Sequence, residues 1–523
     1  MKLRMIIKLL LSIILSSSPF LSVQSAKILS IFPFPGPSQY ICVQAYLKEL
    51  AARGHEVTSV SAFPQKKPLP NFCDISMEEV LNGYEAEAIV DLVSQEHNKW
   101  QELNAYYDFF THGTLTVLKN PGVQELLQSN EKFDLIIVET TQLNAIYTLA
   151  HHYNAPIIGI STWGTDPTID ELVGNTSPIS YIPLPLGQFS DRMNFWQRLT
   201  NLWHYLLHQI HMHLYYLPKQ QEIYKEYFPN GTADIYAVHK NFSLVLLNQH
   251  FSISFPRPYV PNAIEVAGMH INHKPHKLPA DMESFIKNVK EGAIYFSLGS
   301  NVKSKNFSKE KIAIIMRVFA SLPYNILWKF EATELPDKPK NVYIDKWFPQ
   351  PDVLAHPNVK LFITHAGLLS TTEAIHHAKP VVGMPVFFDQ FLNIERIKRA
   401  GIGVGVNYKT FTYDELRNAI VEVLNNPKYT QKIQQISRRY HDRPLKPLDT
   451  AIYWTEYVLR HEGAAHLRVA AQDLNFIQYF SLDTWAVLIG AAVGSLVLFV
   501  FVMYRIYMHF FENEEEVAKL KQN

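Results

Sequence analysis

The chain has few cysteines and no excess of charge. Of its 523 residues only Cys42 and Cys73 are cysteines, and 48 basic residues balance 48 acidic ones. Two cysteines cannot build a disulfide framework, so one bridge or two buried thiols remain open; the helical pattern around Cys42 favours buried thiols. Without a positive excess, nothing steers the whole chain toward nucleic acid or an anionic surface. Nucleic acid is therefore not expected as a partner.

A glycine-rich dinucleotide turn is also missing. The turn after the first predicted strand reads PFPGPSQ, rich in proline, where a nucleotide-dependent oxidoreductase would need G-x-G-x-x-G. That class is discounted. The composition, 47% hydrophobic and 13% aromatic, supplies enough apolar residues for two cores.

Two long apolar runs lie at the ends of the chain. Lys2 and Arg4 precede an apolar run and then small residues, which predicts a secretory signal peptide over 1–26. The uncharged run 485–504 is long enough to cross a bilayer as one helix. Together they predict a single-pass type I protein with a lumenal body and a cytoplasmic tail, 505–523. The final KLKQN resembles the dilysine retrieval signal of endoplasmic reticulum membrane proteins, so that membrane is the expected location.

Four sequons for N-glycosylation agree with a lumenal body. Their asparagines are Asn175, Asn230, Asn241 and Asn306, although Pro178 weakens the first.

Short apolar strands alternate with helical patterns along most of the chain. This alternation predicts an α/β fold with parallel sheets covered by helices. The first series of strands is followed by a second, and a proline-bearing, sheet-free junction is expected at about 261–279. Ligands of such sheets bind beyond the carboxyl ends of the strands, so a cleft between two facing halves is expected. The predicted strands are 27–32, 57–60, 135–138, 156–160 and 244–247, then 293–298, 326–329, 342–344, 360–363, 381–383 and 403–406.

The most specific stretch is 362–390, FITHAGLLSTTEAIHHAKPVVGMPVFFDQ, which reads as strand, tight turn, helix and second strand. It resembles the donor-site signature of the UDP-glycosyltransferase family, which includes the UDP-glucuronosyltransferases. The resemblance implies two facing Rossmann-like domains of the GT-B type, followed by one C-terminal transmembrane helix. It assigns acceptor binding to 27–275, UDP-sugar binding to 285–445, and helices that pack back on the first domain to 446–482.

The resemblance also assigns donor-binding roles within this stretch. A helix start offers unpaired amides and partial positive charge, which suit a diphosphate. There His365 is expected to bond the phosphates, and Gly367 to let the backbone approach closely. Glu373 is expected to accept hydrogen bonds from the ribose hydroxyls, while Asp389 and Gln390 bond the sugar.

Two motifs outside this stretch extend the resemblance. In WFPQ, 347–350, Trp347 is expected to stack on uracil and Gln350 to contact the base or ribose. In FSLGS, 296–300, Ser300 is expected near the phosphates.

On the acceptor side the sequence departs from the family pattern. Members usually carry a base histidine in the turn after the first strand, where this chain has Gln39, and an amide cannot take a proton near neutral pH. The family's orienting aspartate corresponds to Glu139, which is one methylene longer and could act as base directly. A general base contributes about 10²- to 10⁴-fold to a rate, or roughly 3 to 5 kcal/mol.

Two functions fit these patterns. The first is transfer of a hexose or hexuronosyl group from a UDP-sugar to a small lipophilic acceptor, with inversion and with neither metal nor cofactor. Glu139, a water or an acidic acceptor would then replace the missing histidine. The alternative is a catalytically impaired UDP-sugar-binding membrane protein or a partner subunit in a homo- or hetero-oligomer. The donor sugar stays open, because Arg257 in FPRP either favours an acidic sugar or is structural.

An aromatic helical stretch, 192–217, lies outside these motifs. His204, His208 and His211 follow at i, i+4 and i+7, a spacing that could present metal ligands, but no acidic or cysteine partner is in register. An aromatic face, packed inside or touching a membrane, is expected instead.

Overall fold

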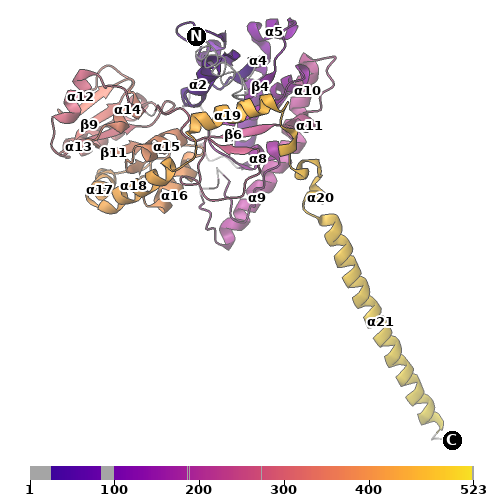
Figure 1. Ribbon diagram of the computed structural model, residues 1–523. Helices are drawn as coiled ribbons and strands as arrows, with labels where there is room; N and C mark the ends of the chain where they lie inside the picture. The colour runs from indigo at the N-terminus through magenta and orange to yellow at the C-terminus, as the bar shows by residue number, and fades with distance from the viewer. Residues whose placement is uncertain (1–24, 84–98, 185–186, 188, 273, 521–523) are drawn as a thin grey trace, which may run out of the picture. The chain divides into compact units, whose positions relative to one another are not determined.

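The computed structural model describes residues 25–83, 99–184, 187, 189–272 and 274–520 (Figure 1). Nearly all of the predicted signal peptide lies outside them, as do residues 521–523 and the side chain of Lys519 in the predicted retrieval signal. Those interpretations stay predictions. The chain divides into two compact units, Met1–Arg468 and Val469–Asn523.

The first unit contains two parallel β-sheets. Their order is β3-β2-β1-β4-β5-β6-β7 in one and β10-β9-β8-β11-β12-β13 in the other. The central strands are continuous runs of buried and mostly apolar residues, as expected when helices cover both faces. The strands are β1 Lys27–Phe32, β2 Glu56–Ser61, β3 Phe72–Ser76, β4 Leu135–Glu139, β5 Ile157–Ser161, β6 Leu244–Leu247, β7 Ala263–Glu265, β8 Ala293–Ser297, β9 Asn325–Lys329, β10 Val342–Asp345, β11 Val359–Thr364, β12 Val381–Gly383 and β13 Gly403–Gly405.

Helices connect and cover these strands (Figure 1). With the first sheet come α2 Pro37–Ala52, α4 Lys99–Lys119, α5 Pro121–Gln128, α6 Asn144–Tyr147, α7 Leu149–His152, α8 Pro167–Val173, α9 Phe195–His211, α10 Leu217–Tyr227 and α11 Ile235–His239. A π-helical turn, Met212–Tyr216, joins α9 to α10. With the second sheet come α12 Ala280–Lys287, α13 Lys309–Ala320, α14 Gln350–Ala355, α15 Leu368–His376, α16 Gln390–Ala400, α17 Tyr413–Asn425 and α18 Pro427–His441.

The two doubly wound sheets confirm the predicted fold class, but two strands were not predicted. β7 lies inside the junction that was expected to be free of sheet, so that expectation is wrong; Ile264 is the one large apolar residue among its three, which gives no apolar run to recognise. β3 is an edge strand without a fully buried residue, and its Asp74 breaks the apolar signal. Cys42 is a buried free thiol as favoured, whereas Cys73 on β3 is free and exposed rather than buried.

A helix from beyond the second sheet completes the core of the first. α19, Pro447–Arg460, packs against α2, where the Tyr46 and Thr455 hydroxyls lie 2.6 Å apart. Ile452 and Val458 belong to the same buried cluster as Val43. The chain therefore returns to its first half, as the resemblance implied for the beginning of 446–482.

The second unit consists mainly of one long helix. α21, Leu482–Leu520, follows the short α20, Phe476–Tyr479. Its part Leu482–Phe511 has a mean hydropathy of 2.7 and contains no buried side chain, which makes it a candidate membrane span by length and composition. The predicted span, 485–504, lies within it.

Candidate functional site

A cavity of about 430 Å³ lies beyond the carboxyl ends of strands from both sheets. Phe34, Gln39 and Trp163 line it from the first sheet's half. The second half contributes all the residues predicted to bind the donor: Ser300, Trp347, Gln350, His365, Gly367, Glu373, Asp389 and Gln390. The fold thus brings together positions spread over ninety residues of sequence.

His365 stands between two glycine-containing turns. It follows β11, and a Cβ added at Gly299 or Gly367 would collide with its ring, so only glycine fits on either side. Ala366 adopts a left-handed φ of 62°, a strained conformation of the kind found at binding sites. Burial, reinforced by the charge of Lys329, lowers the pKa of His365 to about 4. At neutral pH the imidazole is therefore uncharged, and one of its ring nitrogens can donate a hydrogen bond.

Lys329 is a site residue that the motifs did not identify. It is the last residue of β9, lines the cavity and is only 8% exposed at its side chain. Its Nζ lies 2.7 Å from Glu331 and 5.8 Å from the ring centroid of Trp347, which is itself 54% exposed. A basic residue at the carboxyl end of a buried parallel strand is the sequence signal that marks it.

The Glu373 carboxylate is held from two sides. Nε2 of His270 lies 3.0 Å from one oxygen, and Nε2 of Gln350 lies 2.6 Å from the other. His270 comes from the segment between the sheets, lines the cavity and has a side chain that is only 1% exposed. The motifs did not identify it. Gln350, expected on the base or ribose, is committed to Glu373 and Ser370 in this state.

Asp389 and Gln390 begin α16 at the cavity wall. Burial raises the pKa of Asp389 to about 6, against the opposing effects of its hydrogen bond from Asn393 and the charge of Arg396. The side-chain oxygen of Gln390 accepts hydrogen bonds from the backbone amides of Val386 and Phe387, at 2.8 and 3.1 Å. Gln390 thus fixes the loop that presents this wall.

The acceptor-side pair predicted from the sequence is split by the fold. Gln39, in the first turn of α2, lines the cavity and accepts a hydrogen bond from Ser38 at 2.7 Å. Glu139, at the end of β4, is not among the residues lining the cavity and is only 1% exposed. Neither of its oxygens accepts a well-formed hydrogen bond from a side chain or backbone group in the described part of the chain. Direct action of Glu139 as a base is therefore not supported by its position.

Burial raises the pKa of Glu139 to about 8, opposed by the backbone amide of Phe34. Because the folded pKa lies above the ordinary 4.5, the native state keeps a proton that the unfolded chain releases, and stability falls as pH rises from about 4.5 to about 8. We expect Glu139→Gln to be more stable than the wild type by about 2 kcal/mol near pH 6. Urea unfolding across pH measures this; an advantage that persists below about pH 4 would contradict the buried-acid explanation.

Other polar groups on the first half's wall are already engaged. Asp166 caps α8 by accepting from the amides of Thr168 and Ile169, and burial raises its pKa to about 6. His208 of α9 lies 2.7 Å from the Thr168 hydroxyl, and burial lowers its pKa to about 4. His211 does not line the cavity; its Nε2 lies 2.6 Å from the side-chain oxygen of Asn104, and its ring stacks on Tyr107. In the described ranges no group of three or more His, Cys, Asp or Glu could hold a metal ion.

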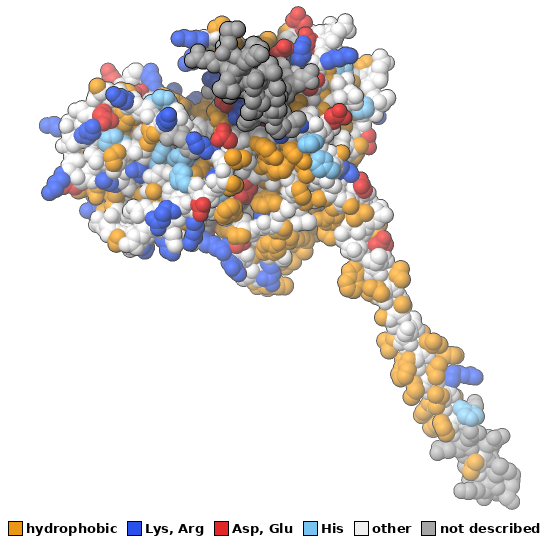
Figure 2. Space-filling model, viewed as in Figure 1, with side chains coloured by type: hydrophobic (Ala, Val, Ile, Leu, Met, Phe, Trp, Pro, Cys, Tyr) orange, Lys and Arg blue, Asp and Glu red, His pale blue; other side chains and the backbone are white. Residues whose placement is uncertain are grey.

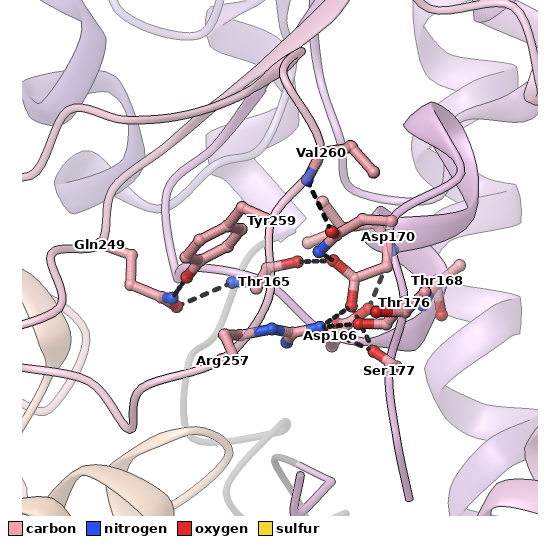
Figure 3. Close-up of polar contacts among 12 residues, drawn as sticks. Thr165, Asp166, Thr168, Asp170, Thr176, Ser177, Gln249, Arg257, Tyr259 and Val260 are labelled. Carbon is pink, nitrogen blue, oxygen red and sulfur yellow. Dashed lines mark hydrogen bonds and ion pairs between the residues drawn. The ribbon is translucent and has the colours of Figure 1, made fainter. Parts of the chain in front are cut away.

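Arg257 does not line the cavity. Its guanidinium pairs with Asp170 of α8 and donates to the Thr176 carbonyl at 2.8 Å and the Ser177 hydroxyl at 3.0 Å (Figure 3). Asp170 also accepts from Thr165. Both charged side chains are almost fully buried. Of the two roles considered for Arg257, the structure supports the structural one.

Asn175 belongs to the same network. Its amide donates to Asp170 at 2.7 Å and accepts from the Val260 amide at 3.1 Å, and the residue is buried. A glycan on this nitrogen is incompatible with the folded protein, so Asn175 is withdrawn as a glycosylation site. Asn230, Asn241 and Asn306 are exposed, and their glycosylation stays a prediction.

Comparison with known proteins bears on the whole chain. A family model described as UDP-glucoronosyl and UDP-glucosyl transferase matches residues 26–518. UDP-glucosyltransferase 2 of Dactylopius coccus is 34% identical over 530 residues, covering 100% of both chains. UDP-glucuronosyltransferase 2B15 of Homo sapiens is 34% identical over 88% of this chain and 90% of its own.

Among solved structures, the calicheamicin glycosyltransferase CalG4 matches with a TM-score of 0.57 over 84% of this chain and 99% of its own. SnogD, a glycosyltransferase from Streptomyces nogalater, matches with a TM-score of 0.53 over 83% and 100%. At 15% and 14% identity these likenesses establish the GT-B fold alone. The matches to the family model and to the two relatives show the family: this chain belongs to the UDP-glucuronosyl and UDP-glucosyl transferases, and with them to the hexosyltransferases.

Proposed function

We propose that this protein transfers a hexose or hexuronosyl group from a UDP-sugar to a small lipophilic acceptor, with inversion at the anomeric carbon. The UDP-sugar is a co-substrate, and the proposal requires neither a metal nor a cofactor. UDP leaves from the wall made by the second sheet, while the acceptor attacks from the wall made by the first. Displacement from the opposite side inverts the carbon.

The observation that carries this proposal is the convergence of the eight donor residues on one cavity wall, opposite an aromatic wall. Tyr106, Phe109 and Trp163 on that opposite wall suit an apolar acceptor. Gln39 provides no base there, so we propose that turnover depends on acidic acceptors, which enter already deprotonated, or on a water that carries the proton away.

We propose further that the protein resides in the endoplasmic reticulum membrane as a single-pass type I protein with a lumenal catalytic unit. The candidate span Leu482–Phe511 and the resemblance of KLKQN to a dilysine retrieval signal support this location.

The test incubates full-length protein in membranes with UDP-glucose, UDP-glucuronate and other UDP-sugars, beside phenols of graded pKa. Product is expected, and it should decline as the phenol's pKa rises. If UDP binds and no acceptor gives product, the alternative applies: a catalytically impaired binding protein or a partner subunit. If UDP does not bind, the proposed donor site is wrong.

Replacing Lys329 should distinguish diphosphate binding from base binding. We expect Lys329→Met to weaken UDP binding about tenfold to hundredfold, because a charged hydrogen-bond donor to an anion contributes about 1.5 to 3 kcal/mol. Uridine binding should not change. Isothermal titration with both ligands measures this, and Lys329→Met/Glu331→Gln controls for the charge left behind. Equal weakening for UDP and uridine would contradict a phosphate role.

His270 is expected to position Glu373 for the ribose. We expect His270→Phe to lower UDP affinity about fivefold to tenfold, the effect of about one lost hydrogen bond. The affinity for 2′,3′-dideoxy-UDP should stay constant, since that ligand has no hydroxyls for Glu373. His270→Gln, which retains a donor, should recover most of the loss. A loss that is the same for both nucleotides would point to general distortion instead.

A further inference from the structure

Helix α9 presents its apolar side chains to the outside of the first unit. Phe195 is 60% exposed, Trp196 72% and Trp203 59%. The same stripe continues with other large apolar side chains, more than a third of each exposed: Leu199, Leu202, Leu206, Ile210 and Leu214. Figure 2 shows hydrophobic side chains gathered on this face of the first unit, where α9 lies in Figure 1. We refer to these eight residues as the α9 stripe.

The inward side of the helix is polar. Asn201 is fully buried, donates to the carbonyls of Ile179 and Ile182, and accepts from the amide of Leu184. His208 bonds Thr168, and His211 bonds Asn104. A helix on the surface of a water-soluble protein has the reverse arrangement, with its apolar stripe inside. These polar contacts hold α9 in this orientation. The apolar side chains are therefore exposed because the inward side is anchored, and not because the helix is loosely packed.

Charge around the stripe is also unusual. Between Asp191 and Glu222 the sequence contains no acidic residue, while Arg192 and Arg198 lie at the start of the helix. An apolar face with aromatic side chains and basic residues at its start is typical of helices that lie in the interface of a bilayer.

A short segment ties the first unit to the candidate span. Only the segment 469–481 separates the first unit from the candidate span that begins at Leu482. Thirteen residues extend at most about 45 Å, so anchoring the span keeps the first unit beside the bilayer. The tether makes contact with lipid an intramolecular event with a high effective concentration.

We propose that the α9 stripe is a second membrane contact, inserted into the interfacial region of the same bilayer that holds the candidate span. The occupant is phospholipid, with the aromatic side chains at the boundary between headgroups and acyl chains. The burial expected for such a helix is about 5 to 10 Å.

The test labels full-length protein at single cysteines. In a Cys73→Ser background, Trp203→Cys carries an environment-sensitive fluorophore, and Phe251→Cys is the matched control because both native side chains are 59% exposed. Neither residue lines the cavity. Single chains are placed in phosphatidylcholine nanodiscs, and quenching by acyl-chain nitroxide lipids is compared with quenching by aqueous iodide.

The label at 203 should be quenched by the nitroxide lipids and lose accessibility to iodide by about tenfold relative to the label at 251. Adding Leu199→Glu and Ile210→Glu should restore iodide access, with circular dichroism to check that the fold is kept. Equal iodide access at 203 and 251 overturns the proposal. Shielding from iodide without nitroxide quenching also overturns it, because another protein surface then covers the stripe. Trp196→Cys repeats the test should the first variant not fold.

Discussion

A Gln39→His variant should transfer sugar to neutral hydroxyl acceptors about 10²- to 10⁴-fold faster than the wild type, because it restores a general base at the cavity wall. Glu139 is buried at the end of β4 and its oxygens have no well-formed hydrogen bond among the described residues, so its carboxyl group could orient an imidazole placed at position 39. The rate should rise with pH through the imidazole pKa, near 6.5, and then level off, since only the neutral ring takes a proton. Steady-state kinetics with phenols and alcohols across pH measures both effects.

Two companion variants separate base catalysis from a change of shape. Gln39→Asn should give no acceleration, and Gln39→His/Glu139→Gln should lose part of the gain. UDP affinity should be unchanged in all three, because Gln39 belongs to the opposite half. If the histidine variant binds UDP normally and is no faster at any pH, the wild type does not lack a base, and another group must remove the acceptor proton.

Replacing Asp170 should destabilise the first half severely. Asp170→Asn keeps the shape of the side chain but leaves the buried guanidinium of Arg257 without its counter-charge, an arrangement that typically costs about 3 to 5 kcal/mol. The network also holds α8, whose Asp166 and Thr168 line the cavity, so acceptor binding should weaken as well. The urea midpoint of tryptophan fluorescence in detergent micelles measures the stability.

The matched control removes both charges. Asp170→Leu/Arg257→Met should recover much of the stability lost in Asp170→Asn, because two apolar side chains replace the pair without leaving an isolated charge. A double variant as unstable as the single one would show that the hydrogen bonds to Thr165 and Ser177, rather than charge compensation, give the network its stability.

The sequence predicted the strands that consist of runs of β-branched and apolar residues. It missed β3, which contains Asp74 and no fully buried residue, and β7, whose one large apolar residue is Ile264. It predicted the donor residues because they belong to a motif with fixed spacing. Lys329 and His270 carry no such motif; their roles follow from what they contact across the fold. The periodicity of α9 showed which side chains share a face, but not which face points inward, because buried Asn201 decides that.

The hydrophobic core of the first sheet's half is still incomplete when all strands of that half have been synthesised. This core includes Ala451, Ile452 and Val458 of α19. The hydrogen-bond partner of Tyr46 is Thr455, which lies more than four hundred residues later in the chain. During translation, domains generally fold in order from the amino terminus. Here the first half must stay open, with part of α2 uncovered, until the second half and α19 have emerged. Only about twenty residues separate the end of α19 from the apolar helix that begins at Leu482. Folding of the first half and membrane insertion of that helix therefore fall close together in time. In chains truncated before α19, the first sheet's half should accordingly fail to fold, although all of its own strands are present.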